Sequence, residues 1–307
     1  MKVIFKKLQW GNCKSQLNKM PNPRFLKTAE RWMNKDAPVE RTATQPTTPT
    51  PQPNNFPTNP DSSFLFSYDG EHGQFFQELI TKTNAVYSGT EAKIPTGTSG
   101  EIQGHLIKSM GLISTIANDS NLRSAGLRPI TATQSEYLLK QGKLTNPEGN
   151  WEDFGMILYD KNSNGYNPKE AQALYDSLKI HRTDLSLSES DLENKLIVVN
   201  PGAEVDSSMP HRVKPVIIPG VTQVYQHEVL EKVGEDLSFD GYGLNGGLPL
   251  LNQLGNGSRT LWMPDEIENI GLRVLFRYGG RVLYARVVVL AYSLSCGRVN
   301  FARSASP

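Results

Sequence analysis

Arginine and aromatic residues alternate with apolar ones over residues 272–292, in the sequence LRVLFRYGGRVLYARVVVLAY. Two β-rich runs meet at Gly279-Gly280, a dipeptide that favours a two-residue hairpin turn. Counting back from this turn pairs Tyr278 with Arg281 and Phe276 with Leu283. One face of the hairpin is then apolar and covers a core. The other is a predicted binding face that carries Arg273, Arg277, Tyr284 and Arg286.

Guanidinium groups beside aromatic rings can pair with phosphates and stack on the bases of single-stranded nucleic acid. This chemistry makes the binding face of the hairpin a candidate contact for an anionic partner. The alternative is that acidic residues of the same chain neutralise the arginines, for example Asp265, Glu266 and Glu268.

A second basic surface is predicted near the N-terminus. Asn22-Pro23 is typical of a helix start, and the helix is expected to run to about Asn34. Its apolar stripe contains Phe25 and Trp32. Such an amphipathic helix can bind nucleic acid, a membrane surface or an acidic protein, or it can pack on the body with its charged face in water. The basic stripe consists of Arg24, Lys27, Arg31 and Lys35.

A different chemistry is suggested by the segment Gly97-Thr98-Ser99-Gly100. Thr98 and Glu101 have the spacing of a capping box, which predicts a helix over about residues 100–117. Backbone N–H groups at a helix N-terminus can hold a phosphate. The alternative function is therefore an enzyme that binds a phosphorylated or anionic small molecule at Thr98, Ser99 and Gly100, with Glu71 and His72 nearby.

Three further motifs lack a part that their chemistry requires. The calcium-loop-like segment from Asp160 to Gly165 has Ala171 where the bidentate glutamate belongs. The glycine motif over residues 241–246 is followed by Gly-Leu-Pro, which argues against the helix of a dinucleotide site. His227 and Glu231 have helical spacing, but the second histidine of a zinc hydrolase is missing. We therefore predict no metal, cofactor or catalytic residue.

The charge of the chain is unevenly distributed. Its 307 residues carry a net charge of +1, yet residues 1–41 contain ten Lys/Arg and three acidic residues. Residues 264–307 contain six Arg and three acidic residues, so the middle of the chain is acidic.

No apolar run approaches the roughly 20 residues of a membrane-spanning helix, and the N-terminus does not resemble a signal peptide. Two cysteines, Cys13 and Cys296, are expected to be free thiols in a reducing compartment, which indicates a cytoplasmic protein.

Three regions are predicted. Residues 1–41 form the basic arm, residues 42–60 form a Pro/Thr-rich linker that is expected to be disordered, and residues 64–303 form the body. The body is expected to be mixed α/β to α+β and to end in an antiparallel β meander. Apolar runs near residues 154–159 and 196–200 flank a helical pattern over residues 168–178, and this order predicts a βαβ unit. A further helix, capped by Thr131 and Gln134, is expected to end at Gly142.

Short motifs in the C-terminal half resemble a family of uncharacterised proteins from small-genome, DPANN-type archaea. They are NGSRTLW (residues 256–262), LAYS (290–293) and GRV (297–299), with FGMILYDKNSNGYN and KPVIIPG before them. The resemblance covers residues 150–302, and Trp262 stands where the family usually has tyrosine. It implies a soluble intracellular protein and no particular activity. With the basic surfaces, we expect a non-enzymatic binding or scaffold protein with a nucleic acid or acidic protein as its partner.

Overall fold

The computed structural model describes residues 60–96, 99–145, 147–148, 151–161, 165–232, 236–264, 271–287, 289–291 and 297–303. The chain divides into two units, Met1–Arg41 and Thr42–Pro307, and all described residues belong to the second, called the body below. The predicted arm with Arg24, Lys27, Arg31 and Lys35, nearly all of the linker, and both cysteines lie outside the described residues.

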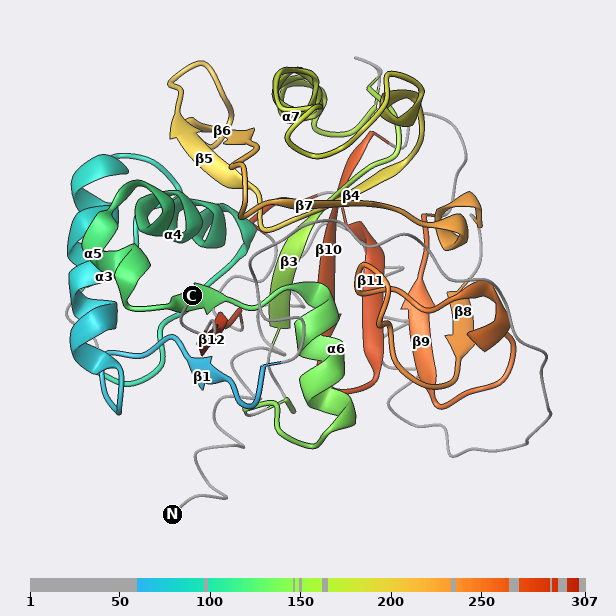
Figure 1. Ribbon diagram of the computed structural model, residues 1–307, viewed down its shortest axis with the longest axis horizontal. Coiled ribbons are helices and arrows are strands. Elements are labelled where there is room, and N and C mark those ends of the chain that lie inside the picture. The colour runs from blue at the N-terminus through green and yellow to red at the C-terminus, as the bar shows by residue number, and fades with distance from the viewer. Residues whose placement is uncertain are drawn as a thin grey trace, which may run out of the picture. The chain divides into compact units, whose positions relative to one another are not determined.

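A seven-stranded sheet forms the centre of the body, in the order β7-β4-β3-β10-β11-β9-β8 (Figure 1). Neighbouring strands are antiparallel except for β9 and β11, which are parallel. The body is thus mixed α/β with a β-rich C-terminal part, as predicted. The strands are β3 Trp151–Leu158, β4 Leu196–Val199, β7 Gln223–Gln226, β8 Asp236–Phe239, β9 Arg259–Trp262, β10 Leu272–Tyr278 and β11 Val282–Val287.

A smaller sheet joins the two ends of the body, because β12 (Asn300–Arg303) lies between β1 (Phe64–Leu65) and β2 (Leu127–Pro129). The helices α3 (Gly73–Val86), α4 (Leu106–Asn118) and α5 (Ser120–Ser124) pack beside it (Figure 1). Their apolar side chains share one core with the small sheet. This core includes Phe66, Phe76, Leu79, Leu112, Ile116, Leu122 and Phe301.

A second core lies between α6 (Ala132–Lys140) and one face of the large sheet. The helix begins with the predicted capping box, in which Thr131 Oγ1 accepts from Gln134 N and Gln134 Oε1 accepts from Thr131 N. The core includes Leu138, Ile157, Ile197, Phe239, Leu261, Leu275 and Leu283. The remaining elements are α7 Pro168–Ile180, β5 Gly202–Val205, β6 Val213–Val216, and the 3-10 helices η1 Ser190–Glu193, η2 Glu228–Glu231 and η3 Leu251–Gln253.

The predicted βαβ unit is wrong in its topology. The strand, helix and strand are present as β3, α7 and β4, but β3 and β4 are antiparallel neighbours, and Leu158 pairs with Leu196. Residues 181–195 follow the helix and bring the chain back to the end of the sheet from which it left. The chain therefore enters β4 at the same end of the sheet at which it left β3, and the two strands are antiparallel.

The helix expected from Gly100 begins later, at Leu106. The backbone of residues 100–104 is already engaged in an extended segment, in which Ile102 N donates to Phe66 O and Gly104 N donates to Gly297 O. Gly100 O accepts from Tyr68 N in the same segment. These bonds compete with helix formation, so Glu101 does not act in a capping box.

The hairpin of β10 and β11 is present, but its register differs from the prediction. Tyr278 pairs with Val282, Arg277 with Leu283 and Phe276 with Tyr284, because the turn uses Arg281 as well as the two glycines. Gly279 takes a left-handed backbone conformation with φ of +57°, which suits glycine. The shift places Phe276 and Tyr284 opposite each other, and it pairs Arg277 with Leu283, a residue of the core against α6.

Candidate functional site

Arg277, a member of the predicted binding face, lies fully buried with 0% of its surface exposed. Its guanidinium forms an ion pair with Glu152 of β3 through Nη2 and donates to Gly279 O through Nη1. Glu152 also accepts from Asn300 Nδ2 and from Ser135 Oγ, the latter at 3.1 Å. The expectation that Arg277 faces a partner is therefore wrong, since its charge is neutralised inside the body.

Arg273 and Arg286, the other two arginines of the predicted face, also contact groups of the body. Arg273 Nη1 donates to Arg286 O at 2.9 Å, and its guanidinium lies 4.3 Å from the centre of the Tyr166 ring. Arg286 Nη1 lies 3.3 Å from Asp236 Oδ1, and its guanidinium lies 4.3 Å from the centre of the Trp262 ring. A hydrogen bond and a cation–π contact thus engage Arg273, and an ion pair and a cation–π contact engage Arg286.

Tyr284, the aromatic member of the predicted face, is 4% exposed. Its ring stacks on Phe276 with centroids 4.2 Å apart, and Trp151 and Trp262 complete an aromatic stack. Burial raises the pKa of the Tyr284 phenol, so the ring remains neutral. Stacking on a nucleic-acid base would require the ring to leave these contacts.

A second buried ion pair joins Arg259 of β9 to Glu136 of α6, whose side chain is 0% exposed. The two contacts are 2.5 Å and 2.8 Å long, which makes the pair bidentate. Glu136 also accepts from Gly243 N at 2.9 Å, and Arg259 Nη1 donates to Gly241 O at 3.0 Å. The pair therefore holds the glycine motif of residues 241–246 in place. The local sequence gave no signal for this pair, because its two residues are 123 positions apart.

The alternative anion site lacks its helix N-terminus, because α4 begins at Leu106. Gly100 N donates to Asp69 Oδ2 at 2.8 Å, so a carboxylate of the chain already binds this N–H. Ser99 is exposed, and Thr98 lies outside the described residues. His72 packs edge-on against Phe64 with ring centroids 4.4 Å apart, and its Nε2 is 3.7 Å from Glu71 Oε1.

Two histidines are buried as neutral groups. His105 lies at the start of α4, with Nε2 3.2 Å from Glu91 Oε1, and burial together with nearby Lys108 and His211 lowers its pKa to about 3. His227 Nδ1 accepts from Val229 N at 3.1 Å, and burial lowers the pKa of His227 to about 4. Within the described ranges, no group of three or more His, Cys, Asp or Glu side chains is arranged to hold a metal ion.

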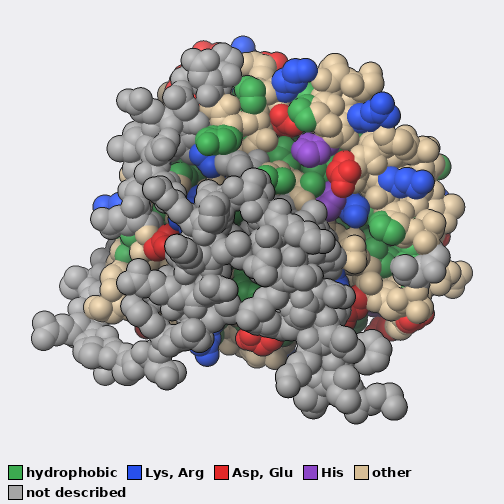
Figure 2. All heavy atoms as spheres, turned by 180° about the vertical axis from the view of Figure 1, so that it is seen from behind, with side chains coloured by type: hydrophobic (Ala, Val, Ile, Leu, Met, Phe, Trp, Pro, Cys, Tyr) green, Lys and Arg blue, Asp and Glu red, His purple; other side chains and the backbone are tan. Residues whose placement is uncertain are grey.

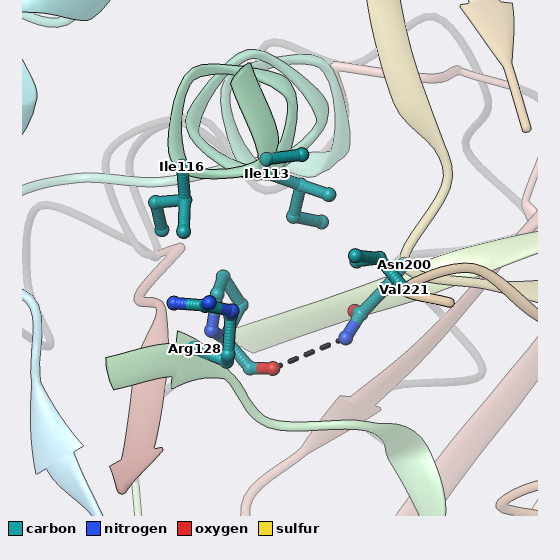
Figure 3. A pocket seen from close by; sticks show the side chains of 7 residues that line it. Ile113, Ile116, Arg128, Asn200 and Val221 are labelled. Carbon is teal, nitrogen blue, oxygen red and sulfur yellow. Dashed lines mark hydrogen bonds between the residues drawn. The ribbon is translucent and has the colours of Figure 1, made fainter. Parts of the chain in front are cut away.

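Two hollows in the body are too small for an organic ligand, which typically needs roughly 300–1,000 Å³. The first lies between α4 and β2, and its lining includes Ile113, Ile116 and Arg128, as Figure 3 shows. Its cavity volume is about 0 Å³. The second has a cavity volume of about 10 Å³ and is lined by both polar and apolar residues.

On the face seen in Figure 2, the Lys and Arg side chains of the described residues are interspersed with acidic and neutral ones. Among the helices that the structure describes, none has the length and apolar character needed to cross a bilayer.

Comparison of the chain with known protein families, characterised proteins and solved structures found no match.

Proposed function

We propose that this protein is a non-enzymatic binding protein whose basic N-terminal arm, residues 1–41, contacts single-stranded nucleic acid. The observation that carries the proposal is the engagement of the hairpin arginines within the body. Arg277 is buried against Glu152, and Arg286 is held by Asp236 and Trp262. The arm then holds the largest remaining excess of positive charge, with ten Lys/Arg and three acidic residues.

The charge of the rest of the chain supports this division of roles. Residues 42–307 contain 22 Lys/Arg and 28 Asp/Glu, an excess of six negative charges. Such a body repels a polyanion at long range, whereas the arm attracts it. The arm also combines Arg24 and Arg31 with Phe25 and Trp32, and arginine and aromatic side chains together suit unpaired bases. The body serves as the scaffold that presents the arm.

The test compares the wild-type chain with two variants of equal charge change. The arm variant replaces Arg24, Lys27, Arg31 and Lys35 with Gln. The control variant replaces four exposed body lysines with Gln, and these are Lys93, Lys140, Lys143 and Lys232. Binding to a fluorescein-labelled 20-nucleotide RNA of mixed sequence is followed by fluorescence anisotropy from 50 to 300 mM KCl.

The wild-type affinity should fall steeply with salt. The slope of log affinity against log salt is negative, and each lost phosphate contact reduces its magnitude by about 0.7 for a single strand. The magnitude should therefore be smaller by up to about 3 in the arm variant. The control variant should keep the wild-type slope. Equal losses in both variants, or an arm variant that binds like the wild type, would show that the arm is not the contact. Poly-L-glutamate that competes as well as RNA would indicate an acidic protein partner instead.

A further inference from the structure

The second of these cavities lies where the seven-stranded sheet meets the small sheet of β1, β12 and β2. Its volume is about 10 Å³. It is bordered by residues from α4, β3, β12 and the segments that follow β2 and β4. The polar side chains in its lining are Ser109, Glu152, Asp153, Asn200, Arg298 and Asn300.

The side chain of Asn300 gives the reason to expect a bound molecule in this cavity. It is 3% exposed, and its Nδ2 donates to Glu152. Its Oδ1 is buried and accepts no hydrogen bond from the described part of the chain. Buried amide oxygens nearly always have a donor, supplied by the protein or by an ordered water.

We propose that one water molecule occupies this cavity and donates a hydrogen bond to Asn300 Oδ1. The volume is about that of a single water site, and a buried water needs two to four polar partners. Ser109, Arg298 and Asp153 belong to the same lining, and their side chains contain groups that can donate to or accept from a water. The inference does not depend on the proposed nucleic-acid contact.

A metal cation fits this cavity less well than water does. Mg²⁺ and Ca²⁺ require six or more oxygen ligands. Glu152 already accepts from Ser135 and Asn300 and pairs with Arg277, and Asp153 Oδ2 accepts from Leu106 N at 2.8 Å. The Arg298 guanidinium in the lining would also repel a cation. A water can accept from that guanidinium and donate to Oδ1.

The site would connect the two sheets through a single solvent molecule. Asn300 belongs to β12 of the small sheet, whereas Glu152 and Asp153 belong to β3 of the large sheet. Ser109 adds α4, the helix that begins at an N–H bound by Asp153. The water would thus complete the hydrogen bonding at the junction of both cores.

The experiment is a crystal structure of the wild-type chain at better than 1.5 Å, together with water-to-amide ROESY spectra of the Asn300 side chain in solution. A single density peak about 2.8 Å from Oδ1, with a long-lived water cross-peak to Nδ2–H, is expected. An Oδ1 that accepts from a protein donor, a dry cavity, or an anomalous peak after soaking in Mn²⁺ or Rb⁺ would overturn the proposal.

A cavity-filling variant, Ser109→Thr, gives an independent measurement. Its added methyl group competes with the water, so the cross-peak should disappear and the melting temperature should fall by several degrees. Ser124→Thr, on the exposed surface of α5, controls for the helix propensity of threonine. If Ser109→Thr melts at or above the wild-type temperature and the wild type shows no cross-peak, the cavity is dry and the proposal is wrong.

Discussion

Replacing Arg277 with methionine should destabilise the protein by about 3–5 kcal/mol, because it leaves the Glu152 carboxylate buried without its cation. Methionine fills a similar volume, so the loss reports the broken pair more than a cavity. Ser135 and Asn300 would still donate to Glu152, and this places the expected value toward the lower end of the range. The corresponding fall in melting temperature is about 10 °C for a body of this size.

The assay is urea unfolding at pH 7, followed by far-UV circular dichroism and by tryptophan fluorescence. Arg281→Met is the matched control, because Arg281 lies in the same hairpin and is exposed. It should change stability by less than about 0.5 kcal/mol. The double variant Arg277→Met/Glu152→Gln should recover much of the loss, since Gln keeps an acceptor for Asn300 without a buried charge. An Arg277→Met protein as stable as the control would refute the buried pair.

Further predictions concern the other buried groups. Arg259→Met should cost about 3–5 kcal/mol by isolating Glu136, and limited proteolysis should then cut within residues 240–250 sooner than in the wild type. Since the folded pKa values of His105 and His227, about 3 and 4, lie below the usual 6.5, the unfolded chain takes up protons first. Stability is therefore full above pH 6.5 and falls as the pH drops, by about 2 kcal/mol per histidine at pH 5; urea titrations at pH 7 and pH 5 should show this loss, and His105→Gln should reduce it. Gly155→Ala would place a Cβ 2.1 Å from Val198 O and should abolish soluble expression, whereas a normal yield and melting curve would contradict the β3–β4 packing.

Local signals in the sequence were sufficient for several elements. The capping box of Thr131 and Gln134 depends on residues three apart, and the structure has it as predicted. The hairpin was also found from its glycine pair. Its register was not, because a two-residue turn and a three-residue turn both suit Gly279-Gly280, and the packing of Phe276 against Tyr284 selects the second.

The buried charges could not be predicted in the same way. Arg277 and Glu152 are 125 positions apart, and Arg259 and Glu136 are 123 apart. Their pairing depends on which strands become neighbours, and the parallel βαβ unit expected from residues 154–200 gave the wrong neighbours. An arginine on a strand has the same local pattern whether it meets solvent or a buried carboxylate. The alternative that acids of the chain neutralise the hairpin is supported for Arg277 and Arg286, through Glu152 and Asp236.

In the proposed function, the arm supplies the positive charge that meets a partner, and the hairpin arginines stabilise the fold. The most direct test measures the salt dependence of RNA binding for the four-residue arm variant and for Arg286→Gln, with circular dichroism to show that both are folded. The magnitude of the negative slope should fall by up to about 3 in the arm variant and should match the wild type in Arg286→Gln. A shallower slope in Arg286→Gln, with an unchanged slope in the arm variant, would contradict the proposed contact.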